Sequence, residues 1–176
     1  MKSHLLHISV ANEIEPVVRG LGQFLKDKAC GGNLQIPLFL EKDRSRQTQI
    51  CKVDLLVLGS DGAKVIVEIE ESGFSPTKIC GKFLTSALAK HFIHDSIPEP
   101  VELGDRVMFV QVLDQSKFPK IGTQKIEQSK RIEGIIQNIV LHGWSSIKKY
   151  NLFLVDGHKD TVKLKAVAEA VSQFLA

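Results

Sequence analysis

Residues 52–70, KVDLLVLGSDGAKVIVEIE, have the pattern of two β-strands joined by a tight turn. The segments 52–58 and 65–70 are rich in valine, leucine and isoleucine, which are typical of buried strands. The intervening Gly59-Ser60-Asp61-Gly62 is a turn signal, because glycine readily adopts the positive φ that short hairpin loops need. The sequence therefore predicts an antiparallel β-hairpin.

Three acids fall on one face of this predicted hairpin. A three-residue loop that ends with Gly62 in the left-handed conformation places Asp54 opposite Glu68. Glu70 shares their face, because side chains alternate along a strand. Like charges directly opposite each other destabilise a sheet. The cluster therefore predicts a bound cation, and carboxylate oxygens are the ligands that hard divalent ions prefer.

The composition is that of an ordinary globular domain. The chain has 176 residues, of which 43% are hydrophobic and 24% charged, and its net charge is +3. This length suffices for a sizeable core, and we expect a single domain over residues 1–176. A small positive charge permits a nucleic-acid partner without requiring one.

The sequence also bears on compartment. We find no apolar run near the ~18 residues that a membrane span needs, and the N-terminal residues make a poor signal peptide. The three cysteines, Cys30, Cys51 and Cys80, are an odd number without CxxC spacing, which favours reduced thiols over a disulfide or zinc site. We therefore expect a cytoplasmic protein with no membrane partner.

Apolar periodicity predicts the remaining elements. Helical spacing is found over residues 13–28, 76–93, 124–141 and 161–175, with Asn12 and Ser75 as caps of the first two helices. Further strands are predicted over residues 34–40, 106–113 and 152–155. The resulting order, α-β-β-β-α-β-α-β-α, predicts an α/β fold with a three-layer mixed β-sheet flanked by helices.

The element order and the acids resemble the PD-(D/E)xK nuclease superfamily over about residues 10–115. The resemblance implies a restriction-endonuclease-like core, α-β-β-β-α-β, with motif acids on the second and third strands and with C-terminal helices added. Asp54 matches the first acid and Glu68 the second. Glu70 stands where the family usually has lysine, which gives the Glu-x-Glu variant known among restriction endonucleases. Val53 replaces the proline, at a position that varies in the family.

The resemblance also implies a metal and its ligands. It implies Mg²⁺, for which Mn²⁺ can substitute, held by side chains and one main-chain carbonyl. The residues implied are Asp54, Glu68, the Ile69 carbonyl, Glu70 and, from the first helix, Glu13 or Glu15. The alternative for the helix glutamates is a solvated position in a first turn, where acids are favoured.

Two lysines on the following helix are further catalytic candidates. In some members of the superfamily the motif lysine has moved to this helix, and Lys78 and Lys82 lie one turn apart on its polar side. Both also fit an ordinary solvated helix face. Glu71 is interpreted as a strand-end residue that points to the other face, and Asp156-Gly157-His158 as a turn.

The leading hypothesis is a magnesium-dependent endonuclease, of restriction or repair type, that hydrolyses phosphodiester bonds in DNA. One such site cuts one strand, so double-strand cleavage favours a homodimer. The alternative is a nuclease-like subunit that binds nucleic acid or acts as a scaffold without catalysis, as the presence of Glu70 in place of lysine suggests. A third hypothesis is an unrelated small-molecule-binding α/β domain, although a glycine-rich strand-to-helix turn is missing. The sequence leaves DNA and RNA both open as substrates.

Overall fold

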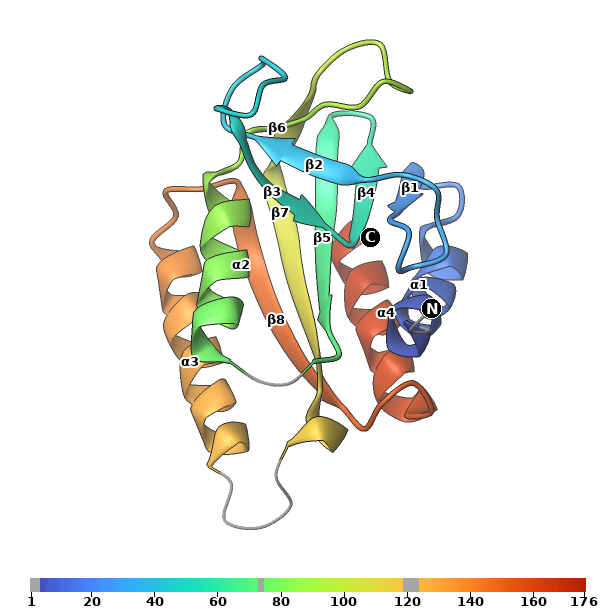
Figure 1. Cartoon of the computed structure of the whole chain (residues 1–176), viewed down its shortest axis with the longest axis vertical. Helices are drawn as coiled ribbons and strands as arrows, with labels where there is room; N and C mark the ends of the chain where they lie inside the picture. Colours follow the sequence, from blue (N-terminus) through green and yellow to red (C-terminus); the bar gives the residue numbers. More distant parts are fainter. Residues whose placement is uncertain (1–3, 73–74, 119–123) are drawn as a thin grey trace.

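The computed structural model describes residues 4–72, 75–118 and 124–176 of the chain. Its helices are α1 (Leu5–Val18), α2 (Pro76–Leu88), α3 (Lys125–Leu141) and α4 (Thr161–Leu175), with a 3₁₀ turn η1 (Gln115–Lys117). Its strands are β1 (Gln23–Lys26), β2 (Ile36–Phe39), β3 (Gln49–Val53), β4 (Leu55–Gly59), β5 (Gly62–Glu70), β6 (His91–Phe92), β7 (Val101–Asp114) and β8 (Ile147–Val155). The strands form an open mixed sheet with helices on both faces, which confirms the predicted α/β class (Figure 1).

The main part of the sheet has the strand order β1-β4-β5-β7-β8. The β4–β5 and β1–β4 pairs are antiparallel, whereas β7 lies parallel to both β5 and β8. Parallel neighbours need a crossover connection, and α2 and α3 lie within the two connections. Both crossover helices lie on the same side of the sheet, while α1 and α4 cover the opposite side (Figure 1).

The predicted hairpin forms, and its register holds along most of its length. Leu56 pairs with Ile66, as expected, and a β-bulge after Val57 shifts the last pairs before the turn. Gly59 therefore pairs with Gly62, and the predicted three-residue loop is wrong, because only Ser60 and Asp61 lie between the strands. Gly62 has a φ of +117°, which the turn requires. A Cβ at this glycine would also lie 2.4 Å from the carbonyl oxygen of Glu102, so the neighbouring strand leaves no room for a side chain.

The predicted unbroken strand over residues 52–58 is wrong, because the chain bends at Asp54. Before the bend, β3 pairs with β2, which reaches the N-terminal end of β7 through β6. After the bend, β4 joins the main sheet. The carbonyl oxygen of Asp54 accepts a hydrogen bond from the Asp27 amide at 3.0 Å, and aspartate is a poor strand former. Asp54 therefore lies where the two branches of the sheet separate.

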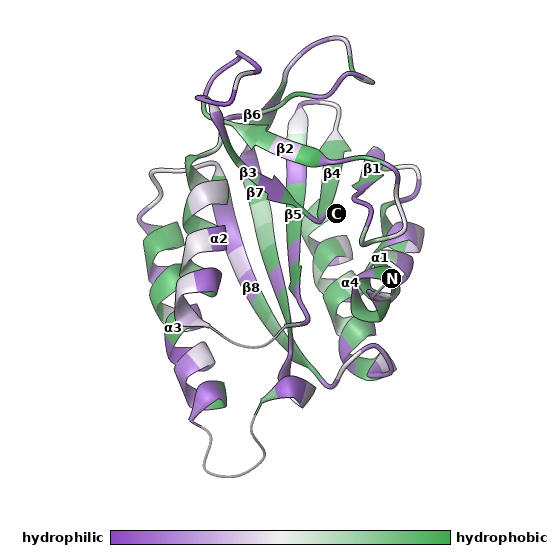
Figure 2. Ribbon diagram, viewed as in Figure 1, coloured by the Kyte–Doolittle hydropathy of each residue, from purple (hydrophilic) through white to green (hydrophobic). Residues whose placement is uncertain are grey.

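Side-chain alternation divides the hydrophobic core into two layers. Leu56, Ile66 and Phe109 pack on the side of α2 and α3, whereas Val57 and Val67 pack under α1 and α4. Hydrophobic residues accordingly concentrate on the central strands and along α1 and α4 (Figure 2). Full burial of one such side chain contributes roughly 1.5–3 kcal/mol, so each layer contributes strongly to holding its helices on the sheet.

The first helix differs most from its prediction. The structure has α1 at Leu5–Val18 in place of a helix over residues 13–28, and Gln23–Lys26 forms the edge strand β1. Asn12 therefore lies inside α1, and Pro16 lies in its last turn, where little helix remains to be disrupted. The helix ends before Gly20, whose φ is +85°. Leu25 fitted the helical spacing but packs from the edge strand.

Two other helices bury fewer apolar side chains than the helical spacing over residues 76–93 and 124–141 predicts. Helix α2 ends at Leu88, and Phe92 belongs to β6. Ile135 is 61% exposed, and Leu84 is 48% exposed, because α2 and α3 present these positions to solvent. Helix α4 has the predicted bounds. In the part of the chain that the structure describes, we find no helix that is long and apolar enough to span a membrane.

Candidate functional site

The three predicted acids come from two neighbouring segments. Glu68 and Glu70 lie on β5, two residues apart, and thus on the face that α2 covers. Asp54 immediately precedes β4, whose first residue pairs with Val67. Its carboxylate oxygen Oδ2 accepts a hydrogen bond from the Ile69 amide at 2.7 Å, which ties the bend to β5. The backbone therefore brings Asp54 next to Glu68, as the hairpin register predicts.

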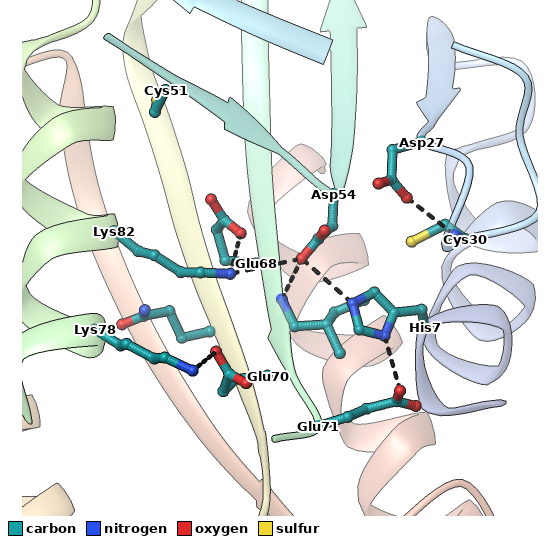
Figure 3. A network of polar contacts seen from close by, with 12 residues as sticks. His7, Asp27, Cys30, Cys51, Asp54, Glu68, Glu70, Glu71, Lys78 and Lys82 are labelled. Atoms are coloured by element: carbon teal, nitrogen blue, oxygen red, sulfur yellow. Dashed lines mark hydrogen bonds and ion pairs between the residues drawn. The ribbon is translucent and has the colours of Figure 1, made fainter. Parts of the chain in front are cut away.

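Lys82 of α2 connects two of these acids. Its Nζ donates a hydrogen bond to Glu68 Oε2 at 2.7 Å and lies 4.0 Å from Asp54 Oδ2 (Figure 3). The helix carries the lysine toward the acids because Ile79 and Phe83, on the adjacent face, are buried in the core. Of the two predicted helix lysines, Lys82 is thus the one that contacts Glu68 and approaches Asp54.

The electrostatics of this group favour a proton on Glu68. Glu68 is only 4% exposed. Burial and the charge of Asp54 raise the pKa of Glu68 to about 8, although Lys82 acts in the opposite direction. Burial alone would lower the pKa of Lys82, but the carboxylates of Glu68 and Asp54 outweigh it and raise that pKa. One ammonium group therefore does not offset the charge of both acids, and Glu68 holds a proton at neutral pH.

Glu70 has a separate set of partners. Its Oε1 accepts hydrogen bonds from the amide and the hydroxyl of Ser72, with the amide at 2.9 Å, and its Oε2 lies 3.4 Å from Lys78 Nζ. Burial would raise the pKa of Glu70, but the Ser72 hydrogen bonds and the charge of Lys78 outweigh it and lower the pKa. Glu70 is therefore ionised at neutral pH.

A buried polar pair lies behind the acids. Gln111 of β7 is the neighbour of Glu68 in the parallel register and is 1% exposed. Its amide nitrogen donates to the carbonyl oxygen of Ile79 at 3.3 Å, and its oxygen accepts from the Tyr150 hydroxyl at 2.7 Å. This pair links α2 to the sheet and so fixes the position of Lys82. The sequence signal for this pair is a single glutamine in an otherwise apolar strand, and the sequence analysis did not use it.

The N-terminal helix contributes histidines in place of the predicted glutamates. His7 Nε2 lies 3.8 Å from Asp54 Oδ2, and His7 Nδ1 lies 3.5 Å from Glu71 Oε2 (Figure 3). Glu71 Oε1 accepts a hydrogen bond from the Leu6 amide at 2.6 Å. Glu71 does point away from Glu70, as predicted, but it docks the start of α1 rather than merely ending a strand.

These residues line a cleft of about 890 Å³. The lining includes Asp54, Ile69, Glu70 and Lys82 from the predicted set. It also includes eight residues that the sequence analysis did not assign to the site: His4, Leu6, His7, Glu71, Ser72, Asp114, Lys117 and His158. Glu68 lies behind Lys82 and is nearly inaccessible.

The other predicted site residues lie outside the cleft lining. Glu13 is half-buried on α1, Glu15 pairs with Lys26 at 3.0 Å, and neither is among the described residues that line the cleft. Lys78 has a 52% exposed side chain and approaches only the Glu70 edge of the site. Searches of protein-family models, curated proteins and solved structures gave no match to this chain.

Proposed function

We propose that the protein is a metal-dependent nuclease that hydrolyses phosphodiester bonds in DNA. The observation that carries the proposal is the shared position of Lys82, within 2.7 Å of Glu68 and 4.0 Å of Asp54 at the wall of a cleft. An acid pair with an adjacent lysine is suited to a phosphate, since the lysine neutralises charge that develops on the phosphate oxygens.

The arrangement of elements supports a restriction-endonuclease-like core. Helix α1, strands β1, β4 and β5, helix α2 and strand β7 follow the helix-strand-strand-strand-helix-strand order that the resemblance implies. Strands β2 and β3 are then an inserted side branch. In this interpretation Asp54 lies at the start of the second core strand and Glu68 on the third, the strands on which the superfamily carries its acids.

The donor set fits a hard divalent cation such as Mg²⁺ or Mn²⁺. Asp54, Glu68, the Ile69 carbonyl and Glu70 offer only oxygen atoms, as these ions prefer. The raised pKa of Glu68 reflects its burial and the nearby charge of Asp54, and a cation here would relieve that repulsion. Bound there, the ion would supply Lewis acidity toward a phosphate oxygen and lower the pKa of a bound water.

The remaining steps belong to side chains of the chain itself. Ionised Glu70, held in place by Ser72, lies in the cleft lining where it can accept a proton from an attacking water. Lys82 stays protonated and can face the phosphate once Glu68 has another partner. Lys117 and His158 at the rim can contact the nucleic-acid backbone.

A binding subunit without catalysis is the second candidate, and one observation favours it. Lys82 already lies where a cation would bridge Asp54 and Glu68. If this ion pair is permanent, the acids stabilise the fold and the cleft only binds nucleic acid. The two candidates differ in whether divalent ions reach the acids at all.

Incubation of supercoiled plasmid with Mg²⁺, Mn²⁺ or EDTA tests the proposal. We expect nicking or linearisation with metal, loss in EDTA, and loss in Asp54→Ala and Asp54→Asn, both checked for folding by circular dichroism. Asp61→Ala is the matched control, because Asp61 lies at the exposed hairpin turn and pairs with Lys64. Linear product without a nicked intermediate would indicate a dimer acting on both strands.

Folded protein that binds plasmid but cleaves it with neither metal would overturn the nuclease proposal in favour of the binding subunit. Cleavage that persists in both Asp54 variants would remove the proposed site. A parallel assay with structured RNA decides between the two substrates, and preferential cleavage of RNA would replace DNA in the proposal.

A further inference from the structure

The α1 side of the cleft carries a group of potential ligands that the acid site does not use. His4 precedes α1 and His7 lies in its first turn, so the two imidazoles are three residues apart on one side of the helix. Their rings lie 5.2 Å apart, and Glu71 lies across from both. The potential ligand atoms of these three residues all lie within 4.8 Å of one another.

The distances from each histidine to Glu71 match those between ligands of a common tetrahedral ion. His4 Nδ1 lies 3.4 Å from Glu71 Oε2, and His7 Nδ1 lies 3.5 Å from the same oxygen. Two ligand atoms that are each ~2.1 Å from a tetrahedral zinc ion lie about 3.4 Å apart. Direct hydrogen bonds would be shorter, with a usual separation of about 2.7–3.2 Å.

His7 gives an independent indication of a missing partner. The residue is 7% exposed, and its Nδ1 is buried without a hydrogen-bond partner in the described structure. A buried polar atom in this state destabilises the fold. The unpartnered atom is the one that faces Glu71, so a ligand bound between His4, His7 and Glu71 would satisfy it.

Only one carboxylate oxygen of Glu71 binds the start of α1. Oε1 accepts the Leu6 amide, as acids at helix N-termini often do, which is a purely structural contact. Oε2 instead faces the two imidazoles. The two oxygens thus have different functions, and only the second is available to a metal.

We infer that His4, His7 and Glu71 form a second metal site, for a borderline-soft transition ion of the zinc class. Imidazole nitrogen suits Zn²⁺ and its neighbours, whereas Mg²⁺ prefers the oxygen-only set around Asp54. Three protein ligands leave one position open toward the cleft, as in catalytic rather than structural zinc sites. This site does not depend on the acids cleaving DNA.

Asp54 joins the two sites without being a ligand of the second. With Nδ1 on the metal, His7 has Nε2–H free to donate toward Asp54 Oδ2, 3.8 Å away. A carboxylate behind a metal-bound histidine fixes its tautomer and orientation. Occupation of the zinc-class site would therefore draw Asp54 toward His7 and couple the two sites.

Metal titration of the untagged full chain tests the inference. We expect one equivalent of Co²⁺ to give the visible absorption of a four-coordinate site, and Zn²⁺ to displace it while excess Mg²⁺ does not. His4→Ala and Glu71→Gln should each weaken Zn²⁺ binding by at least ~10-fold. His4 is half-exposed, and the side-chain amide introduced by Glu71→Gln keeps an acceptor for the Leu6 amide, so both variants should fold.

His142→Ala is the control, because His142 caps α3 and its ring contacts the Asn138 carbonyl of its own helix. Zinc binding must be unchanged in this variant. NMR of the imidazole nitrogens gives a second readout, in which the His7 Nδ1 resonance moves on addition of Zn²⁺. Absence of stoichiometric binding, or equal affinity in wild type, His4→Ala and Glu71→Gln, would overturn the site.

Discussion

The two walls of the cleft share Asp54 but differ in chemistry. On the α2 wall, the carboxylates of Asp54 and Glu68 face the ammonium group of Lys82, and the proposed metal ligands are all oxygens. On the α1 wall, the imidazoles of His4 and His7 face the carboxylate of Glu71. The difference follows from strand alternation, because Glu68 and Glu70 point to one side of β5 and Ile69 packs on the other. Glu70 and Glu71, adjacent residues at the end of β5, thus face the two proposed sites, for which we expect different metal preferences.

Replacement of Asp54 by asparagine should have the largest effect, and it should impair the function of the α2 wall far more than that of the α1 wall. The change removes a charge but keeps an acceptor for the Ile69 amide, so the fold should persist. Cleavage should fall at least ~10³-fold, because a ligand and its charge are lost from the α2 wall. Zinc affinity on the α1 wall should fall only about 10-fold, since Asp54 acts there through His7. Equal losses in both assays would contradict the division into two sites.

The two helix lysines allow a matched comparison on the α2 wall. Lys82→Met leaves Glu68 and Asp54 without their ammonium partner and should lower the free energy of unfolding by about 1–3 kcal/mol. Lys78→Met removes an exposed pair and should cost at most about 1 kcal/mol. Urea denaturation measures both. If Mg²⁺ reaches the acids, it should restore more stability to Lys82→Met than to wild type.

The free energy of unfolding should depend on pH through the titration of Glu68. Its pKa is about 8 in the folded chain against an ordinary value of 4.5. Between these values the folded state holds a proton that the unfolded state has released, so the contribution of Glu68 to stability decreases as pH rises from about 4.5 to 8. Glu68→Gln should remove this decrease, as denaturation at several pH values would show. An identical pH slope in wild type and variant would contradict the raised pKa.

The smallest expected effect is that of Ser72→Ala. Ser72 donates two hydrogen bonds to Glu70 and so lowers the pKa of that carboxyl group. Loss of the hydroxyl should move the pKa of Glu70 upward, and the acid limb of the cleavage pH profile should move with it by a fraction of a pH unit. Zinc binding on the α1 wall should not change. An unmoved acid limb would argue against Glu70 as the proton acceptor.

The hairpin shows how far local patterns reach. The β-branched runs and the glycine turn predict β4, β5 and most of their register, because these contacts are close in sequence. The same alternation predicts that Glu68 and Glu70 share a face, whereas Lys82 was a candidate only through the resemblance to the superfamily. The bend at Asp54 was not predictable, since it depends on the distant Asp27 amide.

The α1 wall shows where such patterns fail. Apolar spacing places a helix at residues 13–28, but the buried stripe begins earlier, with Leu6 and Val10 ahead of the predicted Ile14, and packs against α4 and the sheet. Many weak apolar contacts outweighed the local capping signals. The histidines of this helix carry no signal of their own in the sequence, because their partner Glu71 is far along the chain.

By itself the sequence determined the alternation of β5, the turn at Gly62, the helix over residues 161–175 and the acids of the α2 wall. These features depend on backbone geometry and on residues close in the chain. The tertiary structure decided the bend at Asp54, the start of α1 and the meeting of His4, His7 and Glu71. The Leu6–Glu71 hydrogen bond, which spans 65 residues, is representative. Such contacts form only when separate elements pack on one sheet, and local propensity does not encode that packing.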